Sequence, residues 1–80
     1  MKKEIKDMID EEMDRQTQKW GAYDKESPLE WCPILVEEVG EVAKEIHDMW
    51  FLGAENTDEY IAELVQVAAV AIRMIEDAEE

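Results

Sequence analysis

The 80-residue chain carries 22 acidic and 8 basic residues, which gives a formal net charge of −14 at pH 7. This balance excludes binding to a nucleic-acid backbone or to an anionic membrane surface, because both need clustered Lys and Arg. Cys32 and His47 are the only cysteine and histidine, so neither an intrachain disulfide nor a Cys/His zinc site can stabilise the fold. Small domains that lack both usually associate, and we expect residues 1–80 to form one oligomerising domain.

The N-terminal sequence MKKEIKD contains no apolar segment of signal-peptide length. No stretch of the chain approaches the roughly 20 apolar residues that a membrane span requires. Together with the free thiol, these features predict a cytoplasmic protein without a membrane partner.

The first predicted helix covers residues 2–19. Among its charged residues it carries a thin apolar stripe with three- and four-residue spacing, which consists of Ile5, Met8, Ile9 and Met13. Gly21 is suited to end this helix, and a loop follows. Ser27, Pro28 and Glu30 then match a capping box with proline at the first helical position.

The second predicted helix runs from about Pro28 to Trp50. Pro33 falls in its first two turns and favours an irregular start or a kink. Apolar residues then repeat at four- and three-residue intervals, which is typical of a helix packed against neighbours; they are Leu35, Val39, Val42, Ile46 and Met49. Gly53 marks the turn that ends this helix.

The third predicted helix spans residues 57–78 and is apolar on nearly every side from Leu64 to Ile75, where Gln66 and Arg73 are the only polar residues. A helix that is apolar all round must be covered all round, which two short helices cannot do. We therefore predict an all-α fold in which a three-helix protomer assembles into a dimer or tetramer of the four-helix-bundle type. The acidic C-terminal end is expected to fray.

Carboxylates border the apolar face of the second helix. Glu38, Glu41 and Glu45 are three and four residues apart and so share one face, while Glu63 and Gln66 lie on the polar stripe of the third helix. Antiparallel packing of these helices would bring Glu38 and Glu41 opposite Glu63. Such a group of hard oxygen ligands suits Mg²⁺ or Mn²⁺; the alternative is an ordinary solvated acidic face.

Three segments carry a family resemblance. They read RQTQKWG over residues 15–21, LVEEVGEV over residues 35–42 and ELVQVAA over residues 63–69. Together they resemble the MazG family of all-α nucleoside triphosphate pyrophosphohydrolases, and in particular a small branch associated with phages and mobile elements. The family signature is E-x-x-E, a spacer and then E-x-x-D across two helices, and the resemblance covers roughly residues 11–76.

The resemblance implies Mg²⁺-dependent hydrolysis of an NTP or dNTP between the α and β phosphates, which yields a nucleoside monophosphate and pyrophosphate. It implies a metal site formed by Glu38, Glu41, Glu63 and Gln66, with the three glutamates acting in catalysis. Glu37 is our candidate for orienting or deprotonating the attacking water. The candidates for contacts with the phosphates or the base are Arg15, Lys19, Trp20 and Lys44.

The chain departs from the family signature at Gln66, which stands where the family has aspartate. An amide oxygen can be a weak ligand or bind a metal-bound water, but it does not neutralise Mg²⁺ as aspartate does. Glu37, Glu45 and Glu59 are candidates to supply the missing charge. Two other functions remain open: a catalytically weak or inactive acidic module that binds a nucleotide or a partner protein, and a purely structural bundle that docks on a basic partner.

Overall fold

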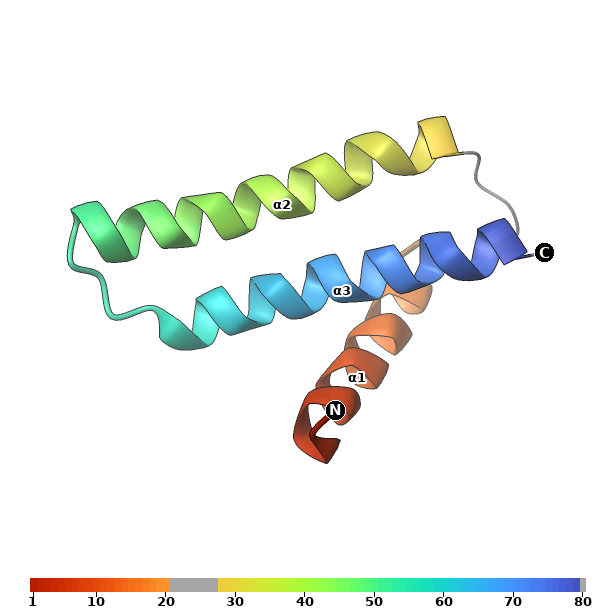
Figure 1. The fold of residues 1–80 in the computed structure, drawn as a ribbon, viewed down its shortest axis with the longest axis horizontal. Helices are drawn as coiled ribbons and strands as arrows, with labels where there is room; N and C mark the ends of the chain where they lie inside the picture. The colour runs from red at the N-terminus through yellow and green to blue at the C-terminus, as the bar shows by residue number, and fades with distance from the viewer. Residues whose placement is uncertain (21–27, 80) are drawn as a thin grey trace.

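The computed structural model describes residues 1–20 and 28–79. It contains three α-helices, α1 over Lys3–Trp20, α2 over Pro28–Phe51 and α3 over Thr57–Glu79, and the described residues contain no strand (Figure 1). The predicted all-α class and the three helices are confirmed. The predicted helix end at Gly21 and the capping box that begins at Ser27 lie outside the described residues.

Helix α2 is continuous from Pro28, which occupies the first helical position, where proline removes no hydrogen bond that the helix needs. It continues through Pro33 without a break. At its C-terminal end Gly53 adopts a positive φ of 65°, and the Ala54 amide donates to the Asp48 carbonyl at 3.1 Å. Glycine suits this position because the left-handed conformation costs it no Cβ clash, so the predicted stop at Gly53 has a clear backbone cause.

Helices α2 and α3 form a long antiparallel hairpin, and α1 crosses α3 at a steep angle (Figure 1). Helix α3 contacts both other helices, whereas α1 and α2 have no contact with each other within the described ranges. Helix α3, which carries the long apolar run of residues 64–75, is therefore the central helix of the protomer.

The interior of the protomer is small. Among the described residues, the buried apolar side chains are Trp31, Ala69 and Val70, and the buried polar one is Gln16. The Trp31 indole N–H donates to the Asp77 carboxylate at 2.6 Å, which fastens the start of α2 to the end of α3. Trp31 is 2% exposed, so it is a packing anchor and does not offer its ring to a base.

Large apolar side chains remain exposed along the hairpin. On α3, Leu64 is 40% and Ile75 58% exposed, and at the end of α2 Trp50 is 81% exposed. The total accessible surface is 5933 Å², whereas a folded monomer of 9.3 kDa is expected to expose about 5,000 Å². None of the described helices is long and apolar enough to cross a membrane.

Candidate carboxylate site

Glutamates from all three helices act on one another electrostatically around the middle of α3. Glu12 comes from α1, and Glu63 comes from α3. Helix α2 contributes Glu38, Glu41 and Glu45, whose three- and four-residue spacing keeps them on one face. We refer to these five residues as the carboxylate cluster.

Glu38 and Glu63 are the two members of this cluster whose burial is not compensated by a hydrogen bond to the buried oxygen. Each is partly buried, and each has an Oε2 atom that is fully buried with no hydrogen-bond partner among the described residues. Burial raises the pKa of Glu38, and the negative charges of Glu63, Glu37 and Glu12 raise it further. Burial also raises the pKa of Glu63, with added repulsion from Glu41, Glu45 and Glu12. Two buried acceptor atoms on facing helices therefore have no donor to offset their desolvation. The positive charges of Lys19 on Glu38 and of Lys44 on Glu63 oppose the rise in pKa only in part.

Glu41 and Glu37 are both exposed on α2. The charge of Glu41 nevertheless reaches Glu63, in agreement with the expected placement of the E-x-x-E face opposite α3. Gly40 directly precedes Glu41 in the sequence, and a Cβ added there would meet no atom within 4 Å. The backbone beside Glu41 is thus open within the protomer.

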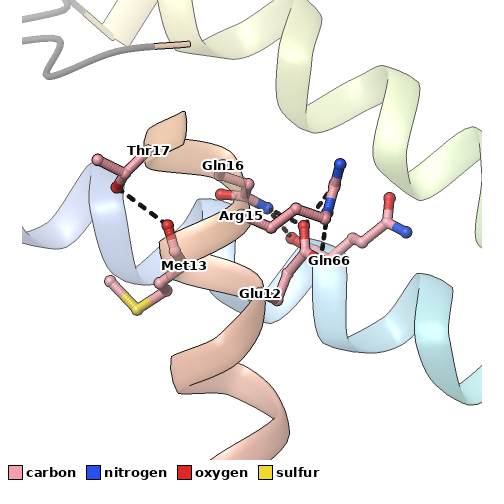
Figure 2. Close-up of polar contacts among 6 residues, drawn as sticks. All are labelled: Glu12, Met13, Arg15, Gln16, Thr17 and Gln66. Atoms are coloured by element: carbon pink, nitrogen blue, oxygen red, sulfur yellow. Dashed lines mark hydrogen bonds and ion pairs between the residues drawn. The ribbon is translucent and has the colours of Figure 1, made fainter. Parts of the chain in front are cut away.

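Glu12 is a member of the cluster that spacing on α2 and α3 does not reveal. Its carboxylate accepts from Arg15 Nε at 2.8 Å and from Arg15 Nη2 at 2.7 Å, and its Oε2 also accepts from Gln16 Nε2 at 2.9 Å (Figure 2). Burial alone would raise the pKa of Glu12, but the hydrogen bonds from Arg15 and Gln16 and the charges of Arg15 and Lys19 outweigh it, so the pKa is lowered. The sequence signal is the E-x-x-R-Q spacing, which puts one acceptor and two donors on a single helical turn.

Gln16 attaches this turn of α1 to α3. Its side chain is fully buried, and its Nε2 reaches the Gln66 carbonyl at 3.5 Å, a long contact. At the next residue of α1, Thr17 Oγ1 accepts from Arg73 Nη1, two turns further along α3, at 2.8 Å. These contacts hold the Glu12 end of α1 against the middle of α3.

Gln66 contributes its backbone carbonyl to this junction, while its side-chain amide extends away from Glu12 (Figure 2). The residue is partly buried and lines a groove of about 320 Å³ between α1 and α3, together with Met8, Glu11, Glu12, Arg15, Ala62 and Val65. Arg15 and Gln66 are thus both part of the groove wall.

The positive residues expected to bind substrate occupy different positions. Arg15 is engaged with Glu12. The charge of Lys19 opposes the burial-driven rise in the pKa of Glu38, which places Lys19 within electrostatic reach of the cluster. Lys44 forms an ion pair along its own helix with Asp48 at 3.9 Å. The Trp20 side chain lies outside the described part of the chain.

Glu45 is already occupied, although the sequence offered it as a substitute for the missing aspartate charge. Its Oε2 accepts from Asn56 Nδ2 at 2.7 Å, and its backbone carbonyl accepts from the same amide at 3.2 Å. Glu45 therefore joins α2 to the start of α3, which leaves Glu38, Glu41 and Glu63 as the cluster members of the hairpin without a hydrogen bond of this kind. Glu59 is exposed on α3.

The residues fit a divalent cation in chemical kind: carboxylate oxygens are the ligands that Mg²⁺ and Mn²⁺ prefer, and two of these oxygens are buried without a partner. Among residues 1–20 and 28–79, no group of three or more His, Cys, Asp or Glu side chains lies close enough together to hold a metal ion. Ligation by Glu38, Glu41 and Glu63 would require their side chains to draw together.

Comparison with known proteins finds no matching protein family, no similar curated protein and no similar solved structure.

Proposed function

We propose that the chain is a Mg²⁺-dependent nucleoside triphosphate pyrophosphohydrolase, with Mn²⁺ as a possible substitute. The reaction converts an NTP or dNTP into the nucleoside monophosphate and pyrophosphate. The proposal combines the resemblance to the MazG family in residues 35–42 and 63–69 with the carboxylate cluster at the α2–α3 hairpin.

The observation that carries the proposal is the pair of buried, unpartnered Oε2 atoms of Glu38 and Glu63. Burying a carboxylate oxygen without a donor costs stability, and such a cost is retained at sites where a ligand relieves it. A solvated acidic face would point both oxygens into water. Burial is the main cause of the raised pKa of both groups. The raised pKa and the absent hydrogen-bond donor thus have the same origin.

Glu38, Glu41 and Glu63 would hold the cation. A bound cation would supply positive charge that stabilises the negative charge developing on the phosphate oxygens. Glu37 is exposed next to Glu38, from where it would orient the attacking water. Arg15, Lys19 and Lys44 would contact the phosphates, and Trp20 would contact the base.

A homo-oligomer, either a dimer or a tetramer, is part of the proposal. The protomer exposes roughly 1,000 Å² more surface than a folded monomer of its mass should, which is close to one partner's share of a standard interface. The exposed apolar residues of the hairpin would form that interface; they include Val39, Ile46, Trp50, Leu64 and Ile75.

A second candidate function is nucleotide or partner binding with little or no turnover. It is favoured by Gln66, which replaces a charged ligand with an amide and extends that amide away from Glu12. A site with three carboxylates holds a divalent cation less firmly than one with four, so binding without efficient hydrolysis is a coherent alternative.

The test is a screen of all NTPs and dNTPs with Mg²⁺ and with Mn²⁺ that measures pyrophosphate release. Activity that disappears in Glu38→Ala and Glu41→Ala supports the enzyme. The matched control is Glu76→Ala, which removes one exposed carboxylate from α3 away from the cluster. Tight nucleotide binding without pyrophosphate release would favour the second function, and the absence of both would exclude the two.

A further inference from the structure

Asn56 links the two helices of the hairpin through its side-chain amide. Its Nδ2 donates to the carboxylate Oε2 of Glu45 at 2.7 Å and to the backbone carbonyl of the same residue at 3.2 Å. An asparagine amide carries two N–H groups, which is the number that these two acceptors need. Serine and threonine have a single O–H, and aspartate would repel Glu45, so the residue type matches the contact.

This contact replaces the capping bond that an asparagine at the start of a helix usually forms. Asn56 directly precedes α3, and its backbone carbonyl accepts from the Tyr60 amide at 2.9 Å, so it is the N-cap residue of α3. The Oδ1 atom of an N-cap asparagine normally accepts from a backbone amide of the first turn. Here Oδ1 is buried and has no hydrogen-bond partner among the described residues. The side chain therefore binds α2 instead of the end of its own helix.

A second hydrogen bond joins the opposite end of the hairpin, so the register of α2 against α3 is defined at two points. This bond runs from the Trp31 indole N–H to the Asp77 carboxylate at 2.6 Å. Along α3, Glu63 lies seven residues after Asn56 in the 21-residue interval between the two contacts. One third of the way along the antiparallel α2, the matching point is the turn over residues 38–41 (Figure 1). The two contacts thus bring Glu63 opposite the E-x-x-E turn, and the Asn56 contact is the nearer of the two.

Like charges oppose the packing of the two helices in this part of the hairpin. Burial raises the pKa of Glu63, and the charges of Glu41 and Glu45 raise it further. Glu38 and Glu63 each bury an Oε2 atom without a hydrogen-bond partner among the described residues. Without the Asn56 contact, repulsion between the two acidic faces would favour their separation.

We propose that Asn56 is a positioning residue of the cation site. Through its hydrogen bonds to Glu45, its amide keeps Glu63 opposite the turn of residues 38–41. The inference rests on the proposed function in so far as this turn and Glu63 hold a divalent cation, and it adds the residue that keeps their helices in register. Outer residues that hold metal ligands in place typically contribute about 10- to 100-fold to metal affinity.

The experiment measures Mn²⁺ affinity by electron paramagnetic resonance, together with the thermal unfolding of each variant. We expect Asn56→Ala, which leaves the net charge unchanged, to bind Mn²⁺ about 10-fold more weakly than the unmodified protein, because the ligands lose their fixed register. A residue that only stabilises the fold would lower the unfolding temperature and leave the Mn²⁺ affinity of the folded protein unchanged. Affinities are therefore compared at a temperature at which each variant is folded.

The exchange variant Asn56→Asp/Glu45→Gln supplies the rescue. It reverses donor and acceptor while it keeps one amide, one carboxylate and the same net charge at the contact, so we expect Mn²⁺ binding within about 3-fold of the unmodified protein. Glu45→Gln alone keeps an acceptor oxygen for Asn56, and its affinity should also stay within about 3-fold. A loss as large as that of Asn56→Ala would make Glu45 itself a ligand and overturn its role as the point of attachment.

Thr17→Val is the matched control. It removes another hydrogen bond between helices, the one that Thr17 Oγ1 accepts from Arg73 Nη1 at 2.8 Å. Because this bond joins α1 to α3, its loss leaves the register of the hairpin intact. We expect a lower unfolding temperature and an unchanged Mn²⁺ affinity.

Unchanged or tighter Mn²⁺ binding by Asn56→Ala would overturn the positioning role, as would an exchange variant that binds no better than Asn56→Ala. Equal losses of affinity in Asn56→Ala and Thr17→Val would also overturn it, because they would show general support of the fold. If the unmodified protein binds Mn²⁺ but releases no pyrophosphate, the enzyme proposal fails while the comparison of variants still decides the role of Asn56. No Mn²⁺ binding by the unmodified protein would overturn the cation site and this role with it.

Discussion

Partly buried glutamates have opposite pKa shifts in two regions of the protomer: where α1 crosses α3, and in the α2–α3 hairpin. At the junction, Glu12 is nearly buried yet has a lowered pKa, because hydrogen bonds from Arg15 and Gln16 and nearby positive charges outweigh its desolvation. At the hairpin, Glu38 and Glu63 are partly buried with raised pKa values, because burial acts on them without a donor to offset it. Burial is the leading cause in all three, so hydrogen-bond donors and neighbouring charges decide the direction of each pKa shift.

This contrast separates a structural carboxylate from a candidate ligand-binding one. The negative charge of Glu12 is compensated within the protomer, mainly by Arg15, and Glu12 stabilises the packing of α1 on α3. Glu38 and Glu63 each have a buried Oε2 atom without a donor, which is the state expected of residues that receive a cation from solution. The predictions below test whether this division holds.

The largest expected effect is on catalysis at the hairpin. Glu63→Gln keeps the shape of the side chain and removes its charge, and we expect pyrophosphate release to fall by about 100-fold or more, since the cation would lose a ligand. Gln66→Asp should have the opposite effect, because it supplies the charge that the family signature carries. Steady-state pyrophosphate assays at saturating Mg²⁺ measure both. Equal activity of Glu63→Gln and the unmodified protein would remove Glu63 from the site.

The next effect is on stability at the junction. Glu12→Ala leaves the Arg15 fork and the buried Gln16 amide without their acceptor, and we expect the free energy of unfolding to fall by about 1–3 kcal/mol. Thermal or urea unfolding monitored by circular dichroism measures it. Asp10→Ala is the control, because it removes an acid from the same helix whose partner Lys6 is exposed. If both variants lose equal stability, Glu12 is an ordinary surface acid.

The sequence predicts the helices well because their signals are local. Apolar spacing within each helix, Pro28 at a start and Gly53 at an end all act within a turn or two of chain. The same local geometry predicts that Glu38 and Glu41 share one face. The apolar run of α3 predicts a helix covered on all sides in a larger bundle, and within the protomer α3 is the helix that both others contact.

Glu12 and Glu45 show where local signals end. The burial of Glu12 depends on the steep crossing of α1 over α3, which is determined by contacts such as Gln16 with the Gln66 carbonyl, 50 residues apart. Glu45 is occupied by Asn56 across the turn, although its spacing matches that of Glu38 and Glu41. In both cases a hydrogen bond that extends beyond the helix of the glutamate underlies its structural role. Residue spacing within one helix does not predict such a bond.

A smaller effect concerns pH. For a carboxyl group whose folded pKa is raised, the folded state binds the proton more readily than the unfolded state, so stability increases as the pH falls. The cation-free protein should therefore gain thermal stability from Glu38 and Glu63 as the pH falls from 7 toward the ordinary glutamate value of 4.5. The lowered pKa of Glu12 acts the other way, and its contribution is lost below that value.

The control for the pH dependence is the double variant Glu38→Gln/Glu63→Gln, which should be more stable than the unmodified protein at pH 7 and should lose most of the gain on acidification. Differential scanning calorimetry between pH 7 and 4.5 without divalent ions measures this. Saturating Mg²⁺ should flatten the profile of the unmodified protein. An unchanged profile in the double variant would assign the pH dependence to other carboxylates.

The smallest effect in stability distinguishes the protomer from its assembly. Gly40 lies in the interior of α2 with open space around a would-be Cβ, so Gly40→Ala should raise the free energy of unfolding by about 0.5–1 kcal/mol through helix propensity alone. If a partner helix or a ligand passes close to Gly40 in the active oligomer, the added methyl group would weaken assembly or nucleotide binding instead. Chemical unfolding measures the first, and analytical ultracentrifugation with pyrophosphate assays measures the second. A variant that is more stable, fully assembled and fully active would show that the open space beside Glu41 faces solvent, and that the glycine serves neither the hairpin nor its partners.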